Sequence, residues 1–404
     1  MHYLSKRAPR LLFACCVAAA VTIALAAPVR GQGLLEGEFG NIDLGRNLVE
    51  PARFPTIREL RELVARPQMT TVLMLKLFGD ENNHHVPIWS SDGQRLAFQR
   101  TTRGSDASKL LVFSSLADAE PKLLSKTPDA YDLMFRWGLN NPASFVFSRI
   151  DSAKQSTEIY YSPDGQALEL RTTAGHCLYP SLYERTDGIR WLAYERDGQV
   201  VHQAWEGTQK EEQPVARGTS PSWNRDGKWL LMARENKQGL ASYQVVVRSI
   251  SVKAPKEVVL PTPSGVFIRS PTWSPQERHI ACYTRDAGDN TPWKILVCPI
   301  TEGAIAKLVA SDVVVNPSFR SEGPTWEPSA RRVWCFSHRQ RQQEYFPLIA
   351  VDAESGQATT VDYPQKCTTP FDLAVNPVTE VPELAFVAHV GVAQDLFVLF
   401  LNHY

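Results

Sequence analysis

The chain has 404 residues, 43% of them hydrophobic, and its formal net charge at pH 7 is +0. This length suffices for two or three ordinary domains, or for one large all-β domain with a substantial core. Without a net charge there is no electrostatic basis for binding nucleic acid or an anionic membrane surface, so we expect neither as a partner.

The first residues have the parts of a secretory signal peptide. Lys6, Arg7 and Arg10 supply a positive start, and an apolar stretch over 11–26 ends on the small-residue pattern Ala-Leu-Ala. We therefore predict a signal peptide over 1–26 and a periplasmic or secreted protein with no stable membrane span after cleavage. The alternative is an uncleaved anchor, although the stretch is short for a span of about 20 residues.

An N-terminal extension is predicted over 27–69. Its segment 55–66, PTIRELRELVAR, indicates a short helix, because Pro55 stands near the start and apolar residues recur on one face. The preceding stretch 33–54 has no strong pattern. We expect that stretch to run over the surface.

A repeated motif begins at Pro87 with PIWSSDGQRLAF. An apolar stretch, the turn Asp92-Gly93 and a second apolar stretch predict a β-hairpin, since Asp bonds its own backbone and Gly accepts a positive φ. Pro-x-Trp opens three further copies, at Pro221, Pro271 and Pro324. The motif therefore marks a structural repeat.

The copies recur about every 40–50 residues, a period typical of four-stranded propeller blades. Tryptophan or an apolar residue marks each copy, at positions 89, 137, 182, 223, 273, 326 and 375. The last copy supplies only three strands, and the stretch 70–78 belongs to no copy. Because unpaired strand edges leave main-chain groups unbonded, we expect 70–78 to complete the last blade. The predicted fold is all-β: a seven-bladed β-propeller over 70–404, closed by an N-terminal strand and preceded by a short helical or irregular segment.

Residues that recur with the repeat are expected in the core rather than at a reactive site. This holds for the repeat tryptophans and for Cys282 and Cys335, which occupy the position of Phe98 and Met232 in other copies. The chain has seven cysteines, of which two lie in the leader; the other five are widely spaced, and no Cys-x-x-Cys occurs. This spacing does not indicate a disulfide framework.

The motif P-x-W-S-x-D-G-x-x-L-A-F resembles the WD40-like β-propeller repeat of the TolB family. The match is best over 87–98 and good over 221–232 and 271–282. The resemblance implies an extracytoplasmic propeller that binds other proteins. Two copies depart from it, with Gln276-Glu277 and Ser329-Ala330 in place of Asp-Gly. We expect their turns to be longer or differently shaped.

The predicted ligand site consists of residues just ahead of each Pro-x-Trp, which in a ring of blades would lie near the channel mouth. They are His85, Tyr179, Arg269 and Glu322, together with Thr219 and Thr369. This mixture of charge, aromatic ring and hydroxyl suits a peptide or another polar group. We therefore predict a monomeric, non-catalytic protein that binds a protein or peptide partner, without a cofactor, a metal ion or catalytic residues.

The alternative is an enzyme. No G-x-S-x-G nucleophile elbow is present, and the histidines form no H-x-x-x-H or H-E-x-x-H pattern. Residues far apart in sequence can still meet in a propeller channel. The competing hypothesis is therefore a metal-dependent propeller enzyme, lyase- or hydrolase-like, that acts on an acidic oligosaccharide and holds its metal through His85 and companions.

Overall fold

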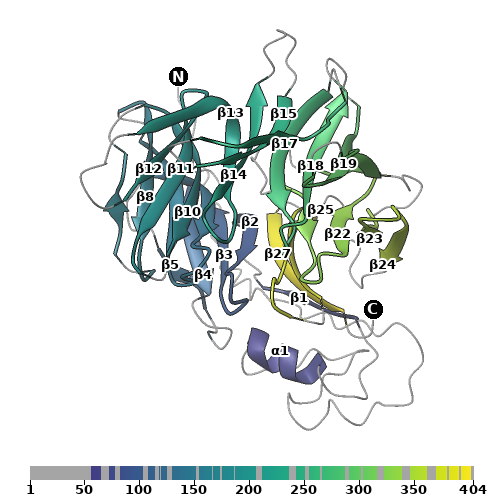
Figure 1. Ribbon diagram of the computed structural model, residues 1–404. Helices are drawn as coiled ribbons and strands as arrows, with labels where there is room; N and C mark the ends of the chain where they lie inside the picture. The colour runs from purple at the N-terminus through teal and green to yellow at the C-terminus, as the bar shows by residue number, and fades with distance from the viewer. Residues whose placement is uncertain are drawn as a thin grey trace, which may run out of the picture.

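The computed structural model describes residues 56–64, 72–77 and 82–401, apart from short internal gaps. The longest gaps are 236–242, 316–322, 339–345 and 362–369. The described residues form one helix, α1 (Ile57–Val64), and the strands β1–β27, which confirms the all-β class and the short N-terminal helix (Figure 1). The predicted leader lies outside the described residues.

The first strands after the extension form an eight-stranded sheet. Its strands are β2 (Asn83–Trp89), β3 (Leu96–Thr101), β4 (Ser108–Phe113), β5 (Lys122–Leu123), β6 (Tyr131–Trp137), β7 (Phe145–Asp151), β8 (Ser156–Ser162) and β9 (Glu169–Leu170). Neighbouring strands pair antiparallel except β4 and β6, which share one parallel pair, Ser108 with Tyr131. This sheet therefore consists of two four-stranded antiparallel runs with a single link.

The middle of the chain forms a seven-stranded sheet. Its strands are β10 (Cys177–Glu184), β11 (Arg190–Arg196), β12 (Gln199–Ala204), β13 (Gln213–Trp223), β14 (Trp229–Glu235), β15 (Tyr243–Ser249) and β16 (Glu257–Val259). Strand β13 serves two runs, because its residues 213–217 pair with β12 and its residues 218–223 pair with β14.

Three four-stranded sheets complete the chain. The first comprises β17 (Val266–Trp273), β18 (His279–Asp286), β19 (Trp293–Pro299) and β20 (Lys307–Val313). The second comprises β21 (Thr325–Trp326), β22 (Arg332–Phe336), β23 (Leu348–Asp352) and β24 (Ala358–Val361). The third comprises β25 (Pro370–Val375), β26 (Glu383–Val390), β27 (Ala393–Leu401) and the N-terminal strand β1 (Val72–Lys76).

The N-terminal strand pairs with the last strand of the chain. β1 runs antiparallel to β27, with Leu73 opposite Phe400 and Leu75 opposite Val398. One further backbone bond, from Leu77 N to Leu396 O at 2.9 Å, extends this pairing beyond β1. The two ends of the described chain are therefore joined in one sheet.

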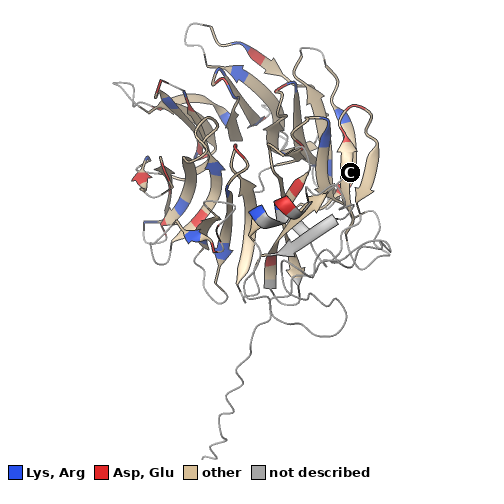
Figure 2. Ribbon diagram, turned by 90° about the horizontal axis from the view of Figure 1, so that it is seen from below, with Lys and Arg blue, Asp and Glu red and all other residues tan. Residues whose placement is uncertain are grey.

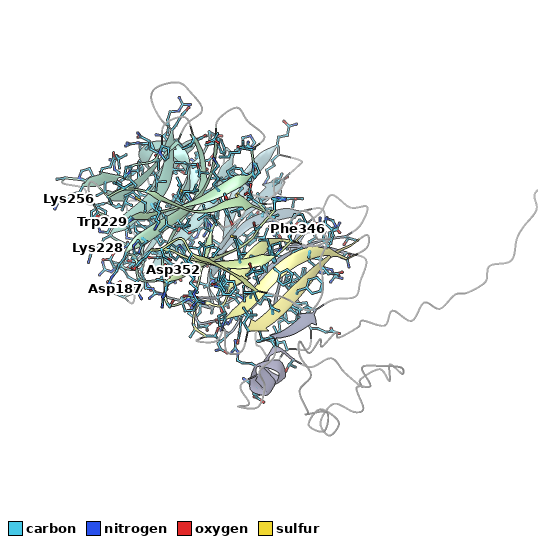
Figure 3. The ribbon with its side chains drawn as sticks, turned by 90° about the vertical axis from the view of Figure 1, so that its right-hand side faces the viewer. Asp187, Lys228, Trp229, Lys256, Phe346 and Asp352 are labelled. Carbon is cyan, nitrogen blue, oxygen red and sulfur yellow. The ribbon has the colours of Figure 1, made fainter. Side chains whose placement is uncertain are left out.

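The hydrophobic core lies between successive four-stranded runs, and side chains fill the spaces between the ribbons (Figure 3). One cluster, for example, joins Trp334 and Leu348 of one sheet to Leu384 and Phe397 of the next. Most of the repeat tryptophans are buried as expected, whereas Trp273 is partly exposed. The motif tryptophans are thus packing residues.

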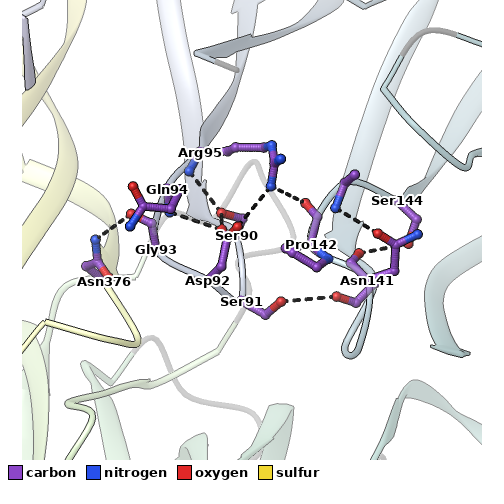
Figure 4. A network of polar contacts seen from close by, with 12 residues as sticks. Ser90, Ser91, Asp92, Gly93, Gln94, Arg95, Asn141, Pro142, Ser144 and Asn376 are labelled. Atoms are coloured by element: carbon purple, nitrogen blue, oxygen red, sulfur yellow. Dashed lines mark hydrogen bonds and ion pairs between the residues drawn. The ribbon is translucent and has the colours of Figure 1, made fainter. Parts of the chain in front are cut away.

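The Ser-x-Asp-Gly stretch of the first copy forms a tight turn with its own side-chain bonds (Figure 4). Ser90 Oγ accepts a hydrogen bond from Arg95 N at 2.9 Å, and Asp92 Oδ1 accepts one from Gln94 N at 3.0 Å. Gly93 has a φ of 65°, in the left-handed region that favours glycine. These polar residues therefore shape the hairpin.

The expectation that the turns without Asp-Gly differ in shape was wrong. Glu277 and Ala330 have φ values of 55° and 59°, close to 65° and 66° at Gly93 and Gly227. In all four turns the backbone N–H of this residue donates to the carbonyl three positions earlier. The pairing of the flanking strands imposes one turn shape, which these non-glycine residues adopt despite the cost of a positive φ.

Candidate functional site

Five of the strands that begin an antiparallel run share an irregularity at the same place. Their register shifts between His85 and Ile88 in β2, and at the matching positions of β6, β10, β13 and β17. In each shift one non-glycine residue has a positive φ, between 44° and 55°. These residues are Val86, Met134, Tyr179, Ser220 and Ser270. Each strand thus contains a β-bulge, which bends the strand and redirects its side chains.

The predicted site residues stand at these bulges. His85, Thr219 and Arg269 each directly precede the residue of positive φ. Tyr179 is itself the bulged residue, at φ 50°, so it does not occupy the same position as the other three; the equivalent residue of β10 is Leu178. Glu322 and Thr369 lie outside the described residues and stay predictions.

The structure distributes the described site residues over different sheets. His85 belongs to the eight-stranded sheet, Tyr179 to the seven-stranded sheet and Arg269 to the sheet of β17–β20. Tyr179 and Arg269 are partly exposed, as is Thr219. The backbone N–H of Tyr179 lies 3.2 Å from Sδ of Met134, so the bulges of neighbouring runs contact each other there.

His85 is buried, with 5% of its surface exposed, and lies near two further histidines. Burial, together with His84 and His389, lowers the pKa of His85 to about 4. Nδ1 of His84 lies 3.1 Å from the carbonyl oxygen of Gln394, and the Gln394 side chain reaches His389 at 3.3 Å. His85 is therefore a neutral side chain within a polar junction between the first and last sheets.

A buried ion pair at the next bulge was not predicted from the sequence. Nε of Arg149 donates to Oδ1 of Asp132 at 2.6 Å, and both side chains are nearly inaccessible to solvent. The same guanidinium lies 4.5 Å from the ring centroid of Tyr160, and Gln99 donates to the Asp132 carbonyl at 2.8 Å. The acid and the base are far apart in sequence and fit no motif, so only strand pairing reveals the contact.

The cysteines of the described chain lie in the core. Cys177, Cys282, Cys298 and Cys335 are buried. Burial raises the pKa of Cys282 and of Cys335 to about 12, which keeps both thiols protonated at neutral pH. The core position expected for Cys282 and Cys335 is confirmed.

Neither a metal centre nor a membrane helix is found in the described part of the chain. No group of three or more His, Cys, Asp or Glu side chains there has the arrangement of a metal site. None of the described helical residues forms a helix long and apolar enough to cross a membrane.

Comparisons with known proteins identify no family: no family model matches the chain, and no curated protein matches its sequence. Among solved structures, oligogalacturonate lyase from Vibrio parahaemolyticus superposes with a TM-score of 0.53 at 9% identity, covering 83% of this chain and 95% of that protein. A prolyl endopeptidase gives a TM-score of 0.51 at 11% identity, covering 86% and 55%.

TolB from Acinetobacter baumannii is also among the similar structures, with a TM-score of 0.47 at 15% identity. The alignment covers 69% of this chain and 66% of that TolB. Similarity at these identities concerns the fold alone. The pairing of strands in successive four-stranded antiparallel runs supports a β-propeller fold.

Proposed function

We propose that this chain is an extracytoplasmic, seven-bladed β-propeller that binds a protein or peptide partner and catalyses no reaction. The proposed blades are β2–β5, β6–β9, β10 to the first half of β13, the second half of β13 to β16, β17–β20, β21–β24, and β25–β27 with β1. The β1–β27 pairing supports a ring closed by the N-terminal strand. We further propose that 1–26 is a cleaved leader and that the mature protein is a monomer.

The observation that carries the proposal is the bulge repeated in the first strand of five of the proposed blades. A β-branched or bulky residue at positive φ costs roughly 1–3 kcal/mol, and such strain concentrates at functional sites. Val86, Met134 and Tyr179 all adopt this strained backbone conformation, at φ values of 44° to 52°. The bulges present Thr219 and Arg269 as partly exposed polar side chains beside the channel of the proposed ring.

Site-specific photo-crosslinking tests this proposal. A photo-reactive residue at position 269 is expected to form a crosslink to one discrete partner when the protein is expressed in cells of its source organism. The same residue at position 256 is the control, because Lys256 is exposed on the outer flank of the molecule (Figure 3). Equal crosslinking at the two positions, or no adduct at position 269, would contradict binding at the first strands.

The second candidate is an enzyme acting on an acidic oligosaccharide. One observation favours it: oligogalacturonate lyase has a higher TM-score than TolB, 0.53 against 0.47, and one such lyase was solved in complex with manganese. This candidate requires His85, with His84 and His389 nearby, to supply metal ligands, whereas the described side chains form no group of three with the arrangement of a metal site.

Incubation of the purified protein with oligogalacturonate, with and without Mn²⁺, decides between the two functions. The binding proposal predicts no unsaturated product by ultraviolet absorbance. Manganese-dependent product that disappears in His85→Ala would establish the enzyme instead.

A further inference from the structure

Helix α1 lies on the lower side of the molecule, below the sheets in Figure 1 and in front of them in the view from below in Figure 2. Its first residues are anchored, since Thr56 and Ile57 are 8% and 3% exposed. Arg58 and Glu62 are exposed, whereas Arg61 is only partly exposed. Arg61 therefore points toward the body of the protein while Arg58 and Glu62 face solvent.

Arg61 is held by groups from the first and last sheets, which together we call the seam socket: the Gly93 carbonyl, Asn376 and Glu383. Nε and Nη2 of Arg61 donate to the two carboxylate oxygens of Glu383, at 2.5 and 2.6 Å. Nη2 also lies 3.4 Å from the Gly93 carbonyl oxygen. Asn376 Nδ2 donates to that same carbonyl at 3.0 Å and to Glu383 Oε2 at 2.9 Å.

The seam socket has the geometry of an arginine-binding site. A planar guanidinium matches a carboxylate through two parallel hydrogen bonds, which a lysine ammonium cannot form. The Glu383 side chain is only 3% exposed, so its charge is poorly solvated without a cation. Burial raises the pKa of Glu383, while Arg61 and Asn376 oppose that rise. An empty socket would therefore favour uptake of a proton or of another guanidinium.

Helix α1, which places Arg61 in the seam socket, is too short to be a stable helix by itself. α1 spans only eight residues. Isolated helices shorter than about 12–15 residues are marginal in water, so α1 depends on docking for its helical structure. Docking and helix formation are thus coupled, as in other order–disorder switches.

We infer that the seam socket is a recognition site for an arginine-bearing peptide segment, and that α1 occupies it as a built-in ligand which such a segment of a partner displaces. The contacts of Arg61 alone support this inference. It holds whether or not the bulged strands bind a partner.

The test uses the full chain and a labelled peptide of residues 54–66, FPTIRELRELVAR. The wild-type protein is expected to bind this peptide weakly, because its own Arg61 fills the socket. Arg61→Ala empties the socket and should strengthen peptide binding at least tenfold by fluorescence anisotropy. Arg58→Ala is the matched control, since Arg58 is an exposed arginine of the same helix.

Further variants test whether peptide binding depends on Glu383 of the seam socket and on the arginine of the peptide. Adding Glu383→Gln to the Arg61→Ala protein should abolish the gain, and so should an Arg61→Lys or Arg61→Ala change in the peptide. Hydrogen exchange of the α1 amides should accelerate in Arg61→Ala and not in Arg58→Ala, while thermal melts establish that each variant is folded. Equal peptide affinity in the wild-type and Arg61→Ala proteins, or binding indifferent to Glu383→Gln, would overturn the inference.

Discussion

At the scale of single residues, the repeat motif is explained by turn capping and close packing. In the four Pro-x-Trp copies the polar residue after the tryptophan is buried and bonds its own hairpin, as Ser274 does by accepting from Arg278 N and His279 N. The fourth turn position requires a positive φ whether or not glycine stands there. Ala330 and Glu277 are therefore strained positions that the sequence alone marked only as departures from the motif.

We expect Ala330→Gly to stabilise the protein. Ala330 has a φ of 59°, where a residue with Cβ loses roughly 1–2 kcal/mol relative to glycine. Part of this gain is offset by the greater freedom of glycine in the unfolded chain, so a net increase of about 0.5–1 kcal/mol is expected. Urea denaturation measures it.

The control for this prediction is Ala358→Gly, at an exposed position of strand β24. Glycine weakens a strand, so this variant should lose roughly 0.5–1 kcal/mol. A loss of stability in Ala330→Gly comparable to that of Ala358→Gly would contradict the assignment of strain.

At the scale of elements, two strands act in ways that their own residues do not specify. β13 is the last strand of one run and the first strand of the next, and it passes from one to the other at Gly218. A Cβ at Gly218 would lie 2.3 Å from the Ala233 carbonyl oxygen, so the crossing requires glycine. β1 comes from the N-terminal region yet completes the C-terminal sheet.

The contribution of the β1–β27 pairing can be measured at its end. Leu77→Pro removes the N–H that donates to the Leu396 carbonyl at 2.9 Å, and the ring of proline also restricts the strand. We expect a loss of about 2–3 kcal/mol in unfolding free energy relative to Leu77→Ala, which keeps the N–H. Equal stability of the two variants would show that the pairing at this end contributes little.

At the scale of the whole molecule, neighbouring four-stranded runs are joined by side-chain hydrogen bonds as well as by apolar packing. The Trp137 indole donates to the Ile88 carbonyl at 3.1 Å, and the Trp273 indole donates to the Ser222 carbonyl at the same distance. Buried histidines also lie within the body, among them His202, which packs near Trp191 and Trp223. The stability of the molecule should therefore depend on pH.

The sign of this dependence follows from two histidines. Burial lowers the pKa of His85 and of His202 to about 4, and Arg248 adds to the effect at His202. The unfolded chain keeps a histidine pKa near 6.5 and therefore binds more protons between pH 6.5 and 4. The stabilising contribution of each histidine is then complete above about pH 6.5 and falls as the pH is lowered toward 4, by roughly 3 kcal/mol for each histidine.

The histidine contribution is isolated by His202→Gln, which cannot titrate in this range. Its unfolding free energy, measured by urea denaturation at several pH values, should fall less steeply than that of the wild type between pH 6.5 and 4.5. A wild-type slope in the variant would show that His202 does not contribute to the loss.

The sequence by itself determined the repeat, the all-β class, the hairpin at Asp92-Gly93 and the short helix near 55–66, because these depend on local turn chemistry and on periodic burial. It also placed the core cysteines and motif tryptophans. Only the tertiary structure decided how the copies interact. It showed the bulges that place Tyr179 differently from His85 and Arg269. It also showed the Asp132–Arg149 and Arg61–Glu383 ion pairs. Those contacts join side chains from different strands, whose distance depends on strand register and sheet packing rather than on any local pattern.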